Sequence, residues 1–208
     1  GRRPVDRRDR NLKVESADFV LSAVAPRDFP AEGLPEIAFV GRSNVGKSSL
    51  LNRVLGKRGL ARTSSTPGRT QEINFFRVNR RVFFVDLPGY GYAKASRDSR
   101  EAWGRLIESY LQDEPERKLV VLLVDAKVGA MASDVEAARY LRSLGVRLEI
   151  VLTKMDKVPR NRRRSSLEAA RVALEMNEES SPLPVSAETG DGIPELWRAL
   201  SAHLGNKT

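Results

Sequence analysis

The chain has 208 residues, a formal net charge of +9 and no cysteine. A length of 208 residues and a hydrophobic content of 40% are typical of one folded domain with a sizeable core. The absence of cysteine excludes disulfides and thiolate metal sites, and a reducing cytoplasmic location is expected. No apolar run approaches the roughly 20 residues of a membrane helix, so no membrane partner is expected. The basic charge favours RNA as a partner over the alternative of a protein that is merely basic.

The order of elements along the chain begins with an arginine-rich stretch and continues with alternating strands and helices. Residues 1–16 are poor in apolar side chains and are predicted to be a flexible basic arm, with a folded domain over residues 17–208. Apolar runs predict strands at residues 37–40, 73–78, 82–85, 119–124, 148–152 and 183–185. Apolar stripes at helical spacing predict helices after residue 48 and around residues 103–111, 135–144, 167–174 and 193–204.

This alternation indicates an α/β fold with three layers. We expect a mostly parallel sheet of about six strands, with helices on both faces. Asn79 and Arg80 separate two of the strands and predict a hairpin, which makes one strand antiparallel. In such a sheet, ligands bind at the carboxyl ends of the strands.

A glycine-rich loop follows the first predicted strand and precedes a helix. Consecutive backbone N–H groups in such a loop surround phosphate oxygens, and the positive end of the helix dipole points at them. Lys47 would contact the outer phosphates and the Ser48 hydroxyl would ligate Mg²⁺. The predicted phosphate-binding residues are Gly41, Arg42, Ser43, Asn44, Val45, Gly46, Lys47, Ser48 and Ser49.

A second motif closes the strand at residues 82–85 and consists of Asp86, Leu87, Pro88 and Gly89. A carboxylate at this position can hold Mg²⁺ through a water molecule. The Gly89 N–H can contact a terminal phosphate, so the loop can respond to the presence of that phosphate.

The last two strand ends carry residues suited to a guanine base: Thr153, Lys154, Met155 and Asp156, then Val185, Ser186 and Ala187. The Asp156 carboxylate can accept hydrogen bonds from the guanine N1–H and exocyclic amine. Adenine lacks this pair of donors and would leave a buried carboxylate unpaired. The Lys154 stem can cover one face of the base.

Together these motifs resemble the translation-factor-related GTPases, and more closely the EngB (YihA/YsxC) family of bacterial ribosome-assembly GTPases. The closer resemblance rests on GRSNVGKSS (residues 41–49), TPGRTQ (residues 66–71) and DLPGYGYAK (residues 86–94), and it extends over residues 18–204. It implies a P-loop NTPase G domain that acts as a Mg²⁺-dependent GTP/GDP switch. It also implies assembly of the large ribosomal subunit as the role, with rRNA and ribosomal proteins as partners, and a requirement in cell division and septation. A monomer is expected, since nothing in the sequence demands a dimer.

The resemblance further assigns the first switch to Gly68, Arg69, Thr70, Gln71 and Glu72. Thr70 would be a Mg²⁺ ligand in the triphosphate state, together with Ser48 and, through water, Asp86. Thr63 and Thr66 have the same chemistry, and only the family register selects Thr70.

Three positions depart from common GTPase patterns. Tyr90 follows Gly89 where many signalling GTPases use a glutamine to orient the attacking water, so slow intrinsic hydrolysis is expected. Thr153 replaces an asparagine, and a hydroxyl lacks the two-sided hydrogen bonding of an amide, so the base loop is expected to be held more loosely. Lys47 and Asn44 are the two candidate catalytic residues. Asn44 either ligates a K⁺ ion beside the phosphates or only stabilises the loop.

Basic clusters lie near the first switch and at residues 160–164, and they are either solvated surface or RNA contacts that depend on nucleotide state. Two rival functions remain open. One is an ATPase or small-molecule kinase that uses the same phosphate loop, and the other is an RNA-binding scaffold with negligible turnover.

Overall fold

The computed structural model describes residues 14–57, 59–61, 72–90 and 97–205. Within these residues, seven strands form one sheet in the order β1-β3-β4-β2-β5-β6-β7. β3 runs antiparallel to β1 and β4, and the remaining neighbours pair in parallel. The predicted α/β class, with a mostly parallel sheet and one antiparallel strand, is confirmed. The strands are β1 Ala17–Ala23, β2 Glu36–Gly41, β3 Ile73–Val78, β4 Val82–Asp86, β5 Lys118–Asp125, β6 Arg147–Thr153 and β7 Leu183–Pro184.

The sheet has seven strands where about six were expected, and the strand without a counterpart among the predicted ones is β1 at the edge of the sheet. Its pairing with β3 shifts register between Phe19 and Leu21, which marks a bulge. A bulge interrupts the alternation of inward and outward side chains that identifies a strand. Phe19 is 52% exposed, although its ring packs edge-on against Phe76 at a centroid distance of 5.8 Å.

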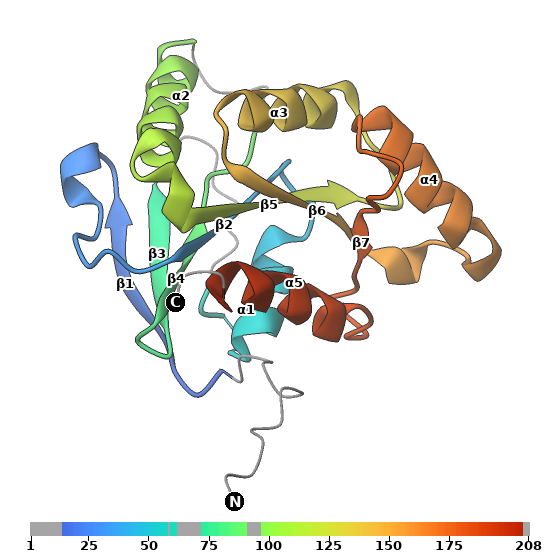
Figure 1. Ribbon diagram of the computed structural model, residues 1–208, viewed down its shortest axis with the longest axis horizontal. Coiled ribbons are helices and arrows are strands. Elements are labelled where there is room, and N and C mark those ends of the chain that lie inside the picture. Colours follow the sequence, from blue (N-terminus) through green and yellow to red (C-terminus); the bar gives the residue numbers. More distant parts are fainter. Residues whose placement is uncertain (1–13, 58, 62–71, 91–96, 206–208) are drawn as a thin grey trace, which may run out of the picture.

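Helices cover both faces of the sheet, as predicted, and produce three layers (Figure 1). α2 and α3 lie above the sheet in this view with α4 beside them, and α1 and α5 lie below it. None of the helices in the described ranges combines the length and apolarity that crossing a membrane requires. The helices are α1 Lys47–Leu55, α2 Arg97–Gln112, α3 Ala132–Ser143, α4 Arg163–Ala173 and α5 Ile193–Gly205, with short 3-10 turns at Pro26–Asp28, Pro115–Arg117, Met155–Lys157 and Arg160–Arg162.

The core consists of one apolar cluster on each side of the sheet. Every residue of β5 is buried, because helices cover both of its faces. Tyr110 of α2 packs in one cluster, and Leu51 of α1 and Leu200 of α5 pack in the other. This burial holds the carboxyl ends of the central strands in fixed positions under the loops that follow them.

The β3–β4 hairpin turns through Asn79 and Arg80, as the sequence predicts. Both have positive φ angles, 51° and 54°, and the Arg81 N–H donates to the Val78 carbonyl at 3.0 Å, so the turn has the geometry of type I′. The Asn79 Oδ1 also accepts hydrogen bonds from the Glu15 and Ser16 amides, at 2.8 and 3.0 Å. The hairpin turn therefore contacts the chain just before β1.

Candidate functional site

The phosphate loop leaves β2 at Gly41 and enters α1 at Lys47, which is the strand–loop–helix arrangement expected from the sequence. Gly46 precedes the helix with φ of 97°, a conformation that favours glycine. A Cβ on Gly41 would lie 2.9 Å from the Leu123 carbonyl oxygen of β5. Any other residue at Gly41 would therefore push the loop away from the sheet.

The carboxylate that ends β4 faces this loop. Asp86 is 7% exposed, and its Oδ1 forms an ion pair with the Lys47 ammonium. The Asp86 carboxylate and the hydroxyl of Ser48, which follows Lys47 at the start of α1, are hard oxygen donors of the kind that Mg²⁺ prefers. These donors fit a Mg²⁺ ion held largely by phosphate oxygens and water. Among the described residues no group of three or more acidic, histidine or cysteine side chains could hold a metal ion alone.

The loop after β6 is joined directly to the phosphate loop. The Thr153 hydroxyl donates to the Val45 carbonyl at 2.6 Å and lies 3.2 Å from the Val124 carbonyl. The Lys154 ammonium donates to the Asn44 carbonyl at 2.6 Å and to Asp125 Oδ2 at 2.7 Å. Thus the predicted base-binding and phosphate-binding loops form one connected unit.

Asp125 was not predicted as a site residue, although a detectable signal exists. It stands at the carboxyl end of the buried strand β5, as Asp86 does on β4. Its Oδ1 accepts the Lys127 amide at 2.9 Å, which orients the other oxygen toward Lys154. A carboxylate at the end of an apolar strand, in a chain with a phosphate loop, is therefore a sequence signal for a residue that pairs with the lysine of the base loop.

Asp156 is oriented by the loop after β7. The Ser186 hydroxyl donates to Asp156 Oδ1 at 2.7 Å, and the Met155 amide donates to the Val185 carbonyl at 3.1 Å. The Ser186 hydrogen bond is the main cause that holds the Asp156 pKa below its ordinary value, and nearby Lys157 lowers the pKa further. The carboxylate is therefore ionised at neutral pH and can accept hydrogen bonds, as guanine recognition requires.

The segment after Gly89 lies against the phosphate loop. The Tyr90 amide donates to the Gly41 carbonyl at 3.3 Å, and the Ser43 amide donates to the Tyr90 carbonyl at 3.4 Å. A Cβ on Gly89 would lie 3.0 Å from the Gly41 carbonyl oxygen, so a larger residue would fit only if one of the two segments moved slightly. Burial raises the pKa of the Tyr90 hydroxyl far above its ordinary value, and the neighbouring Asp134 carboxylate adds to the increase.

Arg42, predicted among the phosphate-binding residues, has a side chain that leaves the loop. Its Nε donates to both carboxylate oxygens of Asp134 on α3, at 3.0 and 3.1 Å. No local pattern distinguishes Asp134 from an ordinary acidic residue in the first turn of a helix. The sequence therefore contained no signal for this pairing.

Two further predicted residues are exposed, and several others lie outside the described part of the chain. Glu72 is exposed just before β3, and the Asn44 side chain is exposed with its backbone φ at 64°. The other first-switch residues, Gly68, Arg69, Thr70 and Gln71, lie outside the described residues, as do Thr63 and Thr66.

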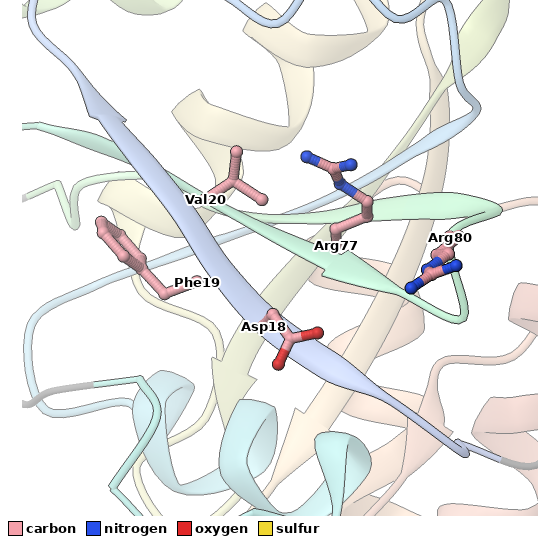
Figure 2. A pocket seen from close by; sticks show the side chains of 5 residues that line it. All are labelled: Asp18, Phe19, Val20, Arg77 and Arg80. Atoms are coloured by element: carbon pink, nitrogen blue, oxygen red, sulfur yellow. The ribbon is translucent and has the colours of Figure 1, made fainter.

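A hollow of about 420 Å³ lies elsewhere, at the edge strand β1. Asp18, Phe19, Val20, Arg77 and Arg80 line it. Figure 2 shows Phe19 pointing to one side of β1 and the two arginines lying on the other. None of the strand-end motifs contributes to this hollow.

Comparison with protein families agrees with this geometry. The family model described as 50S ribosome-binding GTPase matches residues 36–154, which is more than half of the chain. The model of the elongation factor Tu GTP binding domain matches residues 116–206. The fold and the strand-end motifs thus define a P-loop GTPase.

Similar curated proteins carry the description "Probable GTP-binding protein EngB". The one from Oceanobacillus iheyensis is 44% identical over 193 residues, covering 93% of this chain and 99% of that relative. The one from Anaeromyxobacter sp. (strain Fw109-5) is 46% identical over 200 residues, covering 92% of each. The chain belongs to the EngB family of GTP-binding proteins.

Solved structures show the same architecture. A crystal structure of a probable GTP-binding protein EngB has a TM-score of 0.69 and 26% identity, covering 83% of this chain and 100% of that one. A single-substitution variant of Aquifex aeolicus Era bound to GDP and AlF4⁻ has a TM-score of 0.61 at 24% identity, covering 82% of this chain and 56% of that one.

The hydrogen bond between Thr153 and Val45 should be measurable in the stability of the nucleotide-free protein. Replacing Thr153→Val removes the hydroxyl and leaves a buried carbonyl without this donor, so the free energy of unfolding should fall by about 1–3 kcal/mol. Thr153→Ser keeps the hydroxyl and is the matched control. Urea unfolding of both variants checks this, and equal losses in the two would contradict the role of the hydroxyl.

Proposed function

We propose that the chain binds GTP and GDP at the carboxyl edge of its sheet and acts as a nucleotide-dependent switch. The observation that carries this proposal is the pair of contacts by which Thr153 and Lys154 hold the backbone of Val45 and Asn44. One loop carries groups suited to a guanine base and the other carries groups suited to phosphates. Here they share hydrogen bonds, so one nucleotide would contact both.

The proposed roles follow the positions of the side chains. The phosphate loop, residues 41–49, surrounds the phosphates, and Lys47 exchanges its contact with Asp86 for the outer phosphates. The ionised Asp156, held by Ser186, accepts the two guanine donors, and a backbone N–H of residues 185–187 meets the guanine carbonyl. Residues 68–72 form the first switch and residues 86–89 open the second.

Mg²⁺ would be held by Ser48 and, through water, by Asp86, with Thr70 as a further ligand in the triphosphate state. Bound there, the ion would neutralise charge that develops on the phosphate oxygens. The protein's own contribution is the arrangement of Lys47 and the Ser48 hydroxyl at the start of α1 opposite the Asp86 carboxylate at the end of β4.

Slow hydrolysis without a partner is supported by the surroundings of Tyr90. Its hydroxyl donates to Asp134 Oδ1 at 2.8 Å, so it is occupied by a side chain of α3. A phenol in this arrangement does not take the place of a glutamine that orients water. The same observation favours the alternative function, a nucleotide-regulated RNA-binding scaffold with negligible turnover, which single-turnover hydrolysis with and without ribosomal particles would separate.

The proposed partner is the large ribosomal subunit or its precursor, contacted through rRNA and ribosomal proteins by a monomer in the cytoplasm. The family description and the net charge of +9 support this choice. Arg160, Arg162 and Arg164 are exposed immediately after the base loop, where a bound nucleotide could influence RNA contact. We propose assistance in subunit assembly as the role, with normal septation and cell division dependent on it.

Replacing Asp156→Asn tests the guanine assignment and separates it from an ATPase or kinase. An amide offers a donor where guanine also has a donor, so affinity for GDP should fall at least about tenfold, while xanthosine diphosphate should bind more tightly. Asp113→Asn, which changes an exposed aspartate outside the site, is the control. Titrations with labelled nucleotides, with ATP as a competitor, measure these affinities. An unchanged base preference would contradict the assignment of Asp156 to guanine binding.

The K⁺ hypothesis for Asn44 predicts faster hydrolysis in KCl than in NaCl at equal ionic strength. A cation beside the phosphates offsets charge that develops in the transition state, so the rate should rise about tenfold or more. Asn44→Ser should abolish the difference between the two salts. Equal wild-type rates would indicate that Asn44 only stabilises the loop.

Sedimentation with large ribosomal subunits tests the partner. Binding should differ between GDP and a non-hydrolysable GTP analogue, and it should weaken steeply with salt because phosphate contacts release counterions. Replacing Arg160, Arg162 and Arg164 with alanine should weaken binding about tenfold or more. The control replaces three exposed arginines elsewhere, namely Arg80, Arg81 and Arg198.

Salt-insensitive cosedimentation that is the same in both nucleotides would contradict the switch. Equal losses in the two triple variants would instead contradict the assignment of the surface at residues 160–164.

A further inference from the structure

One carboxylate on α3 accepts hydrogen bonds from both segments that surround the proposed phosphate site. Asp134 has no exposed surface. Its Oδ1 accepts from Arg42 Nε at 3.0 Å and from the Tyr90 hydroxyl at 2.8 Å. Its Oδ2 lies 3.1 Å from Arg42 Nε and accepts the Met131 amide at 2.9 Å. α3 is thus connected to the phosphate loop and to the second switch through a single buried group.

The backbone contacts of Tyr90 complete the connection. Tyr90 pairs with Arg42 as a parallel bridge beyond the ends of β2 and β4. In this bridge the Tyr90 amide donates to the Gly41 carbonyl at 3.3 Å, and the Ser43 amide donates to the Tyr90 carbonyl at 3.4 Å. Both bonds are long, so the side-chain bonds to Asp134 should contribute much of what holds Tyr90 in place.

We propose that Asp134 is a positioning residue that sets the second switch against the phosphate loop, by binding Tyr90 and Arg42 together. We call this set of side-chain hydrogen bonds the Tyr90 latch. Tyr90 follows Gly89 directly, so the latch restricts the position of the Gly89 N–H. The proposal rests on the proposed function in one respect, because it assigns that N–H to the terminal phosphate of GTP.

The latch has a specific consequence for nucleotide preference. GDP has no terminal phosphate for Gly89 to contact, so its affinity should not depend on the latch. A GTP analogue should bind best when the Gly89 N–H is already in place, because the nucleotide then does not have to order the segment. Loss of the latch should therefore weaken the GTP analogue selectively.

A structural alternative is that Asp134 only caps α3 through the Met131 amide and that its contact with Tyr90 has no consequence. Tyr90→Phe distinguishes the two, because it removes one hydroxyl and leaves the cap and the Arg42 pair intact. Tyr140→Phe is the matched control, since Tyr140 lies on the same helix with its side chain 43% exposed. Asp134→Asn removes the charge, and the double variant with Tyr90→Phe tests whether both act through one bond.

The first experiment is amide hydrogen exchange of the full-length protein without nucleotide. The Tyr90 and Ser43 amides should exchange about tenfold faster in Tyr90→Phe, the effect expected from losing one charge-assisted hydrogen bond. Asp134→Asn should accelerate the same amides, and the double variant should exchange no faster than Asp134→Asn. Unchanged exchange in Tyr90→Phe, or the same acceleration in Tyr140→Phe, would overturn the latch even if Asp134→Asn fails to fold.

The second experiment compares affinities for GDP and a non-hydrolysable GTP analogue. In Tyr90→Phe the GTP analogue should bind about fivefold or more weakly, with GDP affinity within about twofold of wild type. Faster exchange with an unchanged affinity ratio would overturn the link to the terminal phosphate. Wild-type protein that does not bind guanine nucleotides would instead reject the proposed function, while the exchange result would still decide whether the latch exists.

Discussion

The parallel pairing of β4, β2, β5, β6 and β7 is the constraint on which the site depends. Parallel strands end at the same edge of a sheet, so residues far apart in the chain emerge beside one another. Gly41 ends β2, Asp86 ends β4, Asp125 ends β5 and Thr153 ends β6. Because β5 is buried along its whole length, these strand ends cannot shift independently.

The two lysines at this edge of the sheet each contact a carboxylate. Lys47 contacts Asp86, and Lys154 contacts Asp125 and the Asn44 carbonyl. A buried carboxylate without a partner would be costly, so removing either lysine should destabilise the protein in the absence of nucleotide. Of the two lysines, Lys47 is the one whose partner must change when phosphates arrive, whereas Lys154 can keep its contacts and still present its stem to a base.

The loops at this edge are also linked by hydrogen bonds from uncharged hydroxyl groups. Thr153 and Ser186 each donate from a buried hydroxyl, one to the backbone of the phosphate loop and the other to Asp156. Hydrogen bonds of this kind contribute modestly to stability, but losing one leaves a buried polar atom unpaired. They therefore determine the positions of the loops more than they determine the overall stability.

The sequence by itself determined the α/β class, the site motifs and the approximate positions of most elements, because these depend on local properties. Periodicity, glycine positions and the residues at strand ends are all readable within short windows, and β3 was predicted at its observed bounds. β1 was missed because its bulge interrupts the alternation on which prediction relies. Only the tertiary structure decided that Arg42, Tyr90 and Asp134 meet, since this contact joins residues 44 or more positions apart that β2, β4 and α3 bring together. The hydrogen-bond partners of a buried carboxylate are the groups that the fold places beside it, and no local sequence pattern predicts which groups these are.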